Sequence, residues 1–212
     1  MNVMKINSKK IVPSVYYLNL IHDFLQKFPK ASLGGSFVLR GCKLLPRDIH
    51  DVDFVVPTSC ITDVQNYITS ITNDRVMPKE FITSIELLDD GFGGKHIHTF
   101  IDALKLTDSR SKNLRYLFDR EKRFGKIDVE TNANILKIGV FFQDGGSGFQ
   151  VYDEYLDIFL NLQNIDTIIQ AKEYYVKEKP EAYSSQKHVY DLEFIKQHYE
   201  NFKVGYALNY IL

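Results

Sequence analysis

The sequence has no excess of either charge and very little cysteine. Lysine and arginine total 26 and acidic residues total 27, which gives a formal net charge of -1. A near-zero charge excludes the bulk basic field that marks many nucleic-acid-binding proteins, although a local patch can still exist. The only cysteines, Cys42 and Cys60, lack the spacing of a metal site or a disulfide framework, so we expect reduced thiols in a cytoplasm.

Long apolar runs, low-complexity segments and internal repeats are also absent. Asn19, His22 and Asp23 interrupt the apolar residues 18–25, and no apolar stretch follows the lysines near the N-terminus. The sequence therefore predicts neither a signal peptide nor a membrane span. With 212 residues, of which 44% are hydrophobic, we expect a folded cytoplasmic protein with one sizeable core, or one domain with a small helical appendage.

Hydrophobic periodicity predicts a first half that mixes helices and strands. Apolar residues recur every three to four positions over residues 13–28, which indicates an amphipathic helix. Apolar and polar residues alternate over residues 49–56, which predicts a strand with Asp51 and Asp53 on one side. A glycine-bearing turn at residues 89–94 then joins two strand-like runs into a hairpin.

The second half is predicted to be mostly helical. Helical patterns cover residues 164–179 and 184–200, and Pro180 separates them. We therefore expect an α+β chain with two parts. An α+β domain would cover residues 1–148, and a mostly helical part over residues 149–212 would pack on it.

The residues with the clearest chemical meaning are Gly34-Gly35-Ser36 and, after a spacer of 14 residues, Asp51 and Asp53. Two glycines allow a sharp turn and let the backbone approach a phosphate without a Cβ in the way. A serine at the start of a short helix adds hydroxyl and N–H donors for phosphate oxygens. Two carboxylates at positions i and i+2 of a strand project to the same face, so both can reach one pair of magnesium ions.

In this order the motifs resemble those of the DNA polymerase β-like nucleotidyltransferase superfamily. There, an apolar residue and a Gly-Gly or Gly-Ser turn precede an Asp-x-Asp/Glu strand. The resemblance implies a nucleotidyltransferase fold, with a mixed sheet flanked by helices and both motifs at one end of the sheet. It also implies that Gly34, Gly35 and Ser36 bind a nucleoside triphosphate. Asp51 and Asp53 would hold two Mg²⁺ ions, with Mn²⁺ as an alternative.

The same resemblance implies a third carboxylate on a later strand, for which there are two candidates. Asp102 lies in the return strand of the predicted hairpin, and Asp128 lies in a second apolar-Asp-apolar run. The order of elements in the family favours Asp102. Asp51, Asp53 and Asp102 would then form the catalytic and metal-binding set, with Asp102 assisting the attacking hydroxyl.

A second resemblance concerns the two predicted helices near the C-terminus. Helical pairs that follow many bacterial transferase domains of this superfamily carry Ala-Lys and then Lys-Asp/His-x-x-Asp-Leu, as residues 171–172 and 187–192 do here. The resemblance implies that Lys172 and Lys187 face the triphosphate and that Asp191 orients one of them. The alternative is that Lys187 and Asp191, four residues apart, form an ordinary ion pair on a solvated helix face.

Two histidines form the remaining pattern of interest. His96 and His98 alternate on the predicted return strand and point to one face, near Asp102. Such a pair could bind zinc, but no third nitrogen or sulfur ligand has a suitable spacing. We therefore assign no zinc site.

These expectations describe an enzyme that moves a nucleoside monophosphate from a nucleoside triphosphate to an acceptor. The residues do not identify the acceptor, which could be an RNA 3′ end such as that of a tRNA, a protein hydroxyl or a small molecule. The near-neutral charge mildly disfavours a large RNA. A competing interpretation is a catalytically degenerate transferase fold that binds a nucleotide or a partner. The presence of both Asp51 and Asp53 counts against it.

Overall fold

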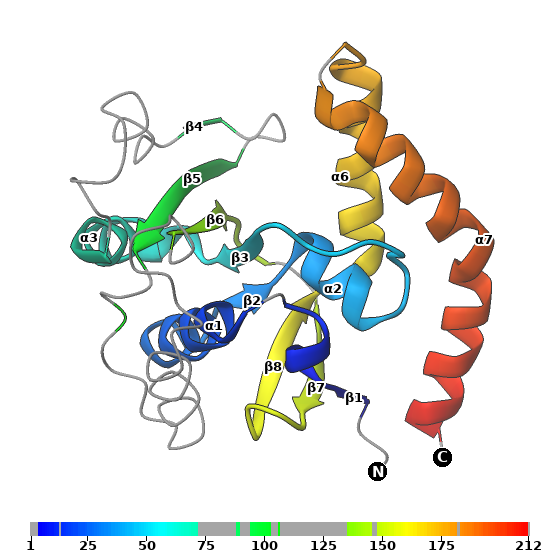
Figure 1. Cartoon of the computed structure of the whole chain (residues 1–212), viewed down its shortest axis with the longest axis horizontal. Coiled ribbons are helices and arrows are strands. Elements are labelled where there is room, and N and C mark those ends of the chain that lie inside the picture. Colours follow the sequence, from blue (N-terminus) through cyan, green and yellow to red (C-terminus); the bar gives the residue numbers. More distant parts are fainter. Residues whose placement is uncertain are drawn as a thin grey trace.

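The computed structural model describes residues 4–12, 14–71, 88–89, 94–102, 106, 135–145, 148–181 and 183–211. In this part of the chain, eight strands form one mixed sheet in the order β1-β7-β8-β2-β3-β6-β5-β4, and helices lie on both sides of it (Figure 1). The strands are β1 (Lys5–Ile6), β2 (Ser32–Leu33), β3 (Val52–Val56), β4 (Leu88–Asp89), β5 (Lys95–Asp102), β6 (Ile135–Phe142), β7 (Gly148–Asp153) and β8 (Ile158–Gln163). The helices are α1 (Val15–Lys27), α2 (Gly35–Gly41), α3 (Ile61–Ile71), α6 (Ile165–Glu178) and α7 (Tyr183–Ile211), with 3₁₀ turns η1 (Ser8–Lys10) and η2 (Thr58–Cys60).

The expected α+β class is confirmed. Strand β8 and all but the first residue of β7 lie within residues 149–212, which we expected to be mostly helical, and β8 pairs with β2 through Leu162 and Leu33. The sheet therefore continues to Gln163, and the helical part begins only at Ile165. The pairing of β8 with a strand that precedes it by more than 100 residues is a long-range contact, which local periodicity does not report.

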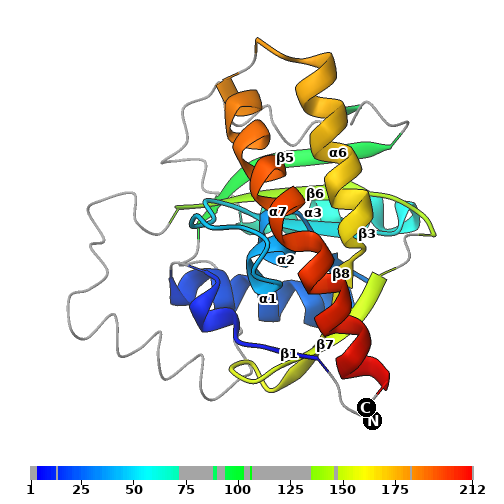
Figure 2. The ribbon, with the colours of Figure 1, turned by 90° about the vertical axis from the view of Figure 1, so that its right-hand side faces the viewer.

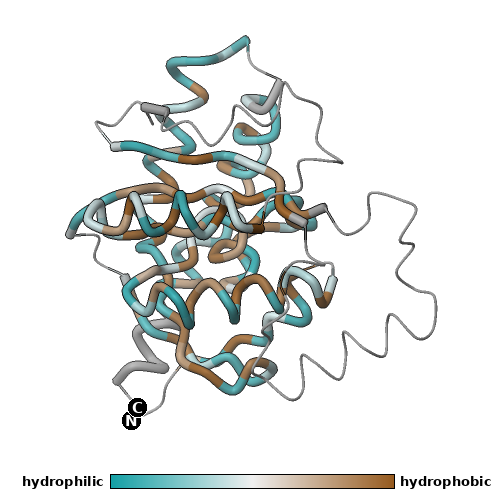
Figure 3. The backbone as a smooth tube through the Cα atoms, turned by 90° about the vertical axis from the view of Figure 1, so that its left-hand side faces the viewer, coloured by the Kyte–Doolittle hydropathy of each residue, from teal (hydrophilic) through white to brown (hydrophobic). Residues whose placement is uncertain are grey.

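One face of the sheet carries the apolar core. Val52, Phe54 and Val56 alternate along β3 and are fully buried. Phe24 of α1 stacks on Phe54 with ring centroids 3.9 Å apart, and Tyr67 of α3 meets Phe24 edge to face. Burying each of these large side chains contributes about 1.5–3 kcal/mol to folding. Figure 3 views the molecule from the side of α1 and α3, whose hydrophobic and hydrophilic segments alternate along the tube.

The opposite face of the sheet is half-buried and mixes polar and apolar side chains. Asp53 and Val55 of β3 point to it, between the buried positions of the same strand. Helices α6 and α7 lie on this side, across the sheet from α1 and α3 (Figures 1 and 2). Within the described ranges, every helix is too short or too polar to span a membrane.

Candidate functional site

The glycine turn and the Asp-x-Asp strand meet in space. Strand β2 pairs antiparallel with β3, and the Gly34 N–H donates a hydrogen bond to the Asp53 carbonyl at 2.8 Å. Gly35 has φ +54°, and a Cβ at this position would lie only 2.0 Å from Oδ2 of Asp53. Glycine is therefore required twice here, for the backbone conformation and for the close approach of the carboxylate. Ser36 follows in the first turn of α2 and is 7% exposed.

The two carboxylates differ in their surroundings. Asp51 Oδ2 lies 3.4 Å from Nζ of Lys137 on β6. The carboxylate of Asp53 lies over Gly139 of β6, where a Cβ would come within 2.4 Å of Oδ1. Among the described residues, no side chain hydrogen-bonds or ion-pairs with the Asp53 carboxylate. Asp53 is thus a partly buried acid held between two glycines.

Burial raises the pKa of Asp53 to about 7, and the negative charge of Asp51 acts in the same direction. The positive charges of Lys172, Lys137 and Lys187 lower it. These lysines come from α6, β6 and α7, so the two C-terminal helices place basic groups close enough to act on Asp53. A divalent cation would remove the repulsion between the two acids.

Asp191 hydrogen-bonds to one of the two lysines that it was expected to orient, Lys172, and also to Arg47. Asp191 is fully buried and accepts hydrogen bonds from Lys172 Nζ at 2.8 Å and from Arg47 Nε and Nη2 at 2.8 and 2.7 Å. Burial acts to raise the pKa of Asp191, but its hydrogen bond from Arg47 and the charge of Lys172 hold it below its usual value. Among the described residues, Asp191 forms no ion pair with Lys187.

Arg47 is a functional candidate that the sequence analysis missed. Its bidentate hydrogen bonds tie α7 to the loop that leads into β3, only four residues before Asp51. Lys172, at 6% exposure, adds α6 to the same cluster, and its Nζ lies 3.2 Å from Nδ1 of His188. The cluster therefore fixes the helical pair relative to the acids. The sequence did show an arginine four residues before the first acid of the Asp-x-Asp motif. Its partner, Asp191, lies 144 residues away, so local sequence does not reveal the pair.

Of the two candidates for the third acidic position, the structure describes only the backbone of Asp102. Asp102 pairs with Ile135 at the far end of β5, two strands from β3. Its side chain, and all of Asp128, lie outside the described residues, so the metal-binding role of Asp102 stays a prediction. Among the described residues, no three His, Cys, Asp or Glu side chains form a ready metal site.

The register of the sheet instead places His98 in line with Asp53. Asp53 of β3 pairs with Gly139 of β6, which pairs in turn with His98 of β5. A Cβ at Gly139 would lie 3.3 Å from His98 Nε2 as well as 2.4 Å from Asp53 Oδ1. Nε2 is buried and has no hydrogen-bond partner among the described residues. Burial lowers the pKa of His98 to about 4, and His96 and Lys137 contribute in the same direction.

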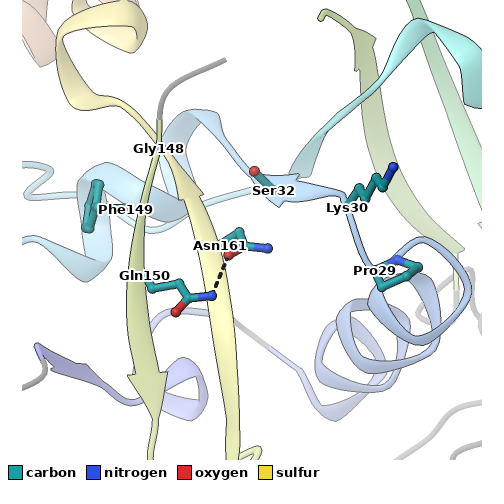
Figure 4. Close-up of a pocket in the computed structure, with 7 residues that line it drawn as sticks. All are labelled: Pro29, Lys30, Ser32, Gly148, Phe149, Gln150 and Asn161. Carbon is teal, nitrogen blue, oxygen red and sulfur yellow. Dashed lines mark hydrogen bonds between the residues drawn. The ribbon is translucent and has the colours of Figure 1, made fainter. Parts of the chain in front are cut away.

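A cavity of about 400 Å³ opens at the other end of β2 (Figure 4). Its lining includes Lys30 and the polar side chains of Ser32, Gln150 and Asn161, and Gln150 Nε2 donates a hydrogen bond to Asn161 Oδ1 at 3.1 Å. Ser32 pairs with Val55, which is two residues from Asp53 on β3. The cavity and the acids therefore lie along the same face of the sheet. The remaining lining residues are Pro29, Gly148 and Phe149.

Comparisons with protein-family models, with curated proteins and with solved structures found no match for this chain. The chemistry of the site is therefore the basis for assigning a function. Two acids, a close-approach glycine turn and converging lysines suit a ligand that carries both a divalent cation and phosphate groups.

Proposed function

We propose that this chain is a metal-dependent nucleotidyltransferase with the fold of that superfamily, and that it moves a nucleoside monophosphate from a nucleoside triphosphate to an acceptor. The observation that carries the proposal is the contact between the Gly35 turn and the Asp53 carboxylate. Two motifs that are separate in the sequence thereby become one site. The positive charges of Lys172, Lys137 and Lys187, on three different elements, favour the ionised form of that carboxylate and lower its pKa.

The residues present fit a divalent cation. Asp51, directly before β3, and Asp53, within it, offer hard oxygen ligands. Gly35 and Gly139 leave room for the Asp53 carboxylate that a Cβ would fill. Asp51 and Asp53 would hold Mg²⁺, or Mn²⁺ as the alternative, as a pair of ions. When bound, such a pair activates the attacking oxygen and stabilises the leaving group.

The side chains of this chain position the substrate. The Gly34-Gly35 turn lets phosphate oxygens approach the backbone, and the Ser36 hydroxyl lies at the start of α2. Lys172 and Lys187 supply point charges for phosphate oxygens. An acceptor oxygen then bonds to the α-phosphorus, the bond from the α-phosphorus to the bridging oxygen breaks, and pyrophosphate leaves. Catalysis rests on orientation and charge neutralisation, with no covalent intermediate.

The acceptor is to be found by experiment. An RNA 3′ end such as that of a tRNA, a protein hydroxyl and a small molecule all supply the oxygen that this reaction needs. The chain is incubated with each of the four α-labelled nucleoside triphosphates, a divalent cation and cell extract. Separation of the labelled products by class then identifies both the nucleotide and the acceptor.

The site assignment is tested with the double variant Asp51→Asn/Asp53→Asn. Cation-dependent triphosphate binding, measured by calorimetry, should be abolished, while the fold persists because the two acids repel each other without metal. The control is Asp48→Asn/Asp63→Asn, which removes the same charge from two exposed acids. Unchanged triphosphate affinity in the Asp51/Asp53 variant would remove the basis of the proposal.

One observation favours a second candidate, a catalytically degenerate transferase fold that only binds a nucleotide or a partner. The Lys137 ammonium ion-pairs with Asp51, and the neighbouring strand β6 has no acidic residue. The Lys137 ammonium gives the Asp51 carboxylate a positively charged partner without a metal ion. Tight triphosphate binding with no pyrophosphate release in the presence of extract would support the binding module over the enzyme.

A further inference from the structure

Two polar groups face each other above Gly139 and lack partners among the described residues. Asp53 Oδ1 lies over the glycine from one side, and His98 Nε2 borders the same position from the other. The nitrogen is buried, and no described group hydrogen-bonds to it. Buried polar atoms in native proteins are nearly always satisfied, by protein, water or a bound ion, so this arrangement indicates a missing partner.

We propose that His98 is a ligand of the divalent cation that Asp53 holds, and that the site consequently prefers Mn²⁺ to Mg²⁺. The inference rests on the proposed function only in taking Asp53 as a cation ligand. A cation between Asp53 and His98 satisfies the carboxylate and the imidazole together. Substrate phosphates and water then complete its coordination.

The sheet register supports His98 over the acid that the sequence suggested on the same strand. His98 and Asp53 lie in one row across β5, β6 and β3, with Gly139 between them. Asp102 lies four residues further along β5, which corresponds to about 13 Å at roughly 3.3 Å per residue. A glycine in the middle of the row allows the two flanking side chains to approach over it.

Asp53 and His98 are the adjacent pair for the cation, because both border the position above Gly139. Asp51, whose ion pair with Lys137 a cation would replace, remains the second acid of the site.

The donor set then selects among cations. Magnesium prefers oxygen ligands and an octahedral shell that keeps several waters. Imidazole nitrogen suits the first-row transition metals, and a mixed set of carboxylate and imidazole accommodates Mn²⁺ better than Mg²⁺. Because His98 is the nitrogen donor closest to Asp53 in the register, removing it should reduce this preference specifically.

The test uses the full chain and Mn²⁺ as the probe, with and without a non-hydrolysable triphosphate. The free six-line electron paramagnetic resonance signal reports Mn²⁺ affinity, and competition gives the Mg²⁺ affinity. His98→Gln should weaken Mn²⁺ binding by about tenfold or more and change Mg²⁺ binding less than about threefold. His96→Gln is the control, because His96 is on the same strand and face, with its ring 4.9 Å from that of His98, but pairs with Phe141 and not with Gly139. It should keep the imidazole coupling of His98 and leave both affinities within about threefold of the wild-type values.

A second measurement begins with the wild-type chain, so its first result does not depend on how a variant folds. Pulsed electron paramagnetic resonance of the wild-type chain should show the nitrogen coupling of one imidazole bound to Mn²⁺, and His98→Gln should then lose it. Mn²⁺ binding without imidazole coupling overturns the role of His98 and leaves the proposed function standing. Failure to bind Mn²⁺ both with and without the triphosphate overturns the metal site and the proposed function together.

Discussion

Replacing Gly35 with alanine tests the geometry that joins the two motifs. Gly35 has φ +54°, and its added Cβ would lie 2.0 Å from Asp53 Oδ2. The left-handed conformation alone costs an alanine about 1–2 kcal/mol. Forcing Asp53 away from the Cβ, into a strained side-chain torsion, costs about 0.5–1.5 kcal/mol more. Gly35→Ala should therefore lower the free energy of unfolding by about 1.5–3.5 kcal/mol in urea denaturation.

A matched control separates these two contributions. Gly145 also has a positive φ, +76°, but an added Cβ there meets nothing within 4 Å. Gly145→Ala should show the conformational cost without the clash. In the Asp53→Ala background the cost of Gly35→Ala should fall to that of Gly145→Ala, because the carboxylate that meets the Cβ is gone.

The same substitution should affect function more strongly than stability. A displacement of the Asp53 carboxylate by about 1 Å can lower turnover by about 100-fold, because the reacting groups lose their alignment. Calorimetry with Mg²⁺ and a triphosphate analogue measures the effect on binding, and pyrophosphate release measures it on turnover. The reasoning is refuted if Gly35→Ala costs no more stability than Gly145→Ala and keeps wild-type triphosphate affinity.

Three further predictions concern charges around the site. Burial and a neighbouring acid raise the pKa of Asp53 from 3.8 to about 7, so the contribution of Asp53 to the free energy of unfolding in metal-free buffer should fall as pH rises through that window. His98, whose pKa is lowered, contributes with the opposite sign, so the quantity measured is the difference in free energy of unfolding between the wild type and Asp53→Asn. In urea titrations this difference should fall as pH rises, and a pH-independent difference would contradict the prediction. Asp191→Ala should cost about 3–5 kcal/mol because buried cations lose their partner, whereas Glu200→Ala, in an exposed pair, should cost less than about 1 kcal/mol in the same assay. Lys187→Ala should weaken triphosphate binding by about 2–5 kcal/mol in calorimetry. The exposed Lys177→Ala control should not, and equal effects of the two would place Lys187 outside the site.

Local sequence patterns were sufficient for the elements that carry the acids. The spacing of Asp51 and Asp53 within an alternating apolar run predicted a half-buried strand, and β3 has this pattern. The Gly34-Gly35 turn was also predicted from residue types, because only glycine tolerates such conformations and contacts. That these two segments are neighbours was an expectation from the family resemblance, and the antiparallel pairing of β2 with β3 agrees with it.

Long-range pairings could not be predicted in this way. Asp191 was expected to orient a lysine and does hydrogen-bond to Lys172. Its second partner, Arg47, lies 144 residues earlier in the sequence and was not expected. Strands β7 and β8 carry alternating buried positions at Val151, Leu160 and Leu162, but the pairing of β8 with β2, more than 100 residues earlier, has no local signal. In both cases the stabilising contact depends on how distant segments pack, which a window of neighbouring residues does not encode.

The positions of His98 and Asp102 on β5 also show that local sequence does not report long-range strand pairing. Both residues lie on β5, four positions apart. The family resemblance favoured Asp102 through the order of its elements, and carboxylates are the usual magnesium ligands. The register of β5 against β6 decides which of the two lies level with Asp53, and it selects His98. A slip of two residues between β5 and β6 would keep every side chain on its face but would move His98 by about 7 Å along the strand. Which residue of β5 lies level with Asp53 therefore depends on strand pairing and not on composition.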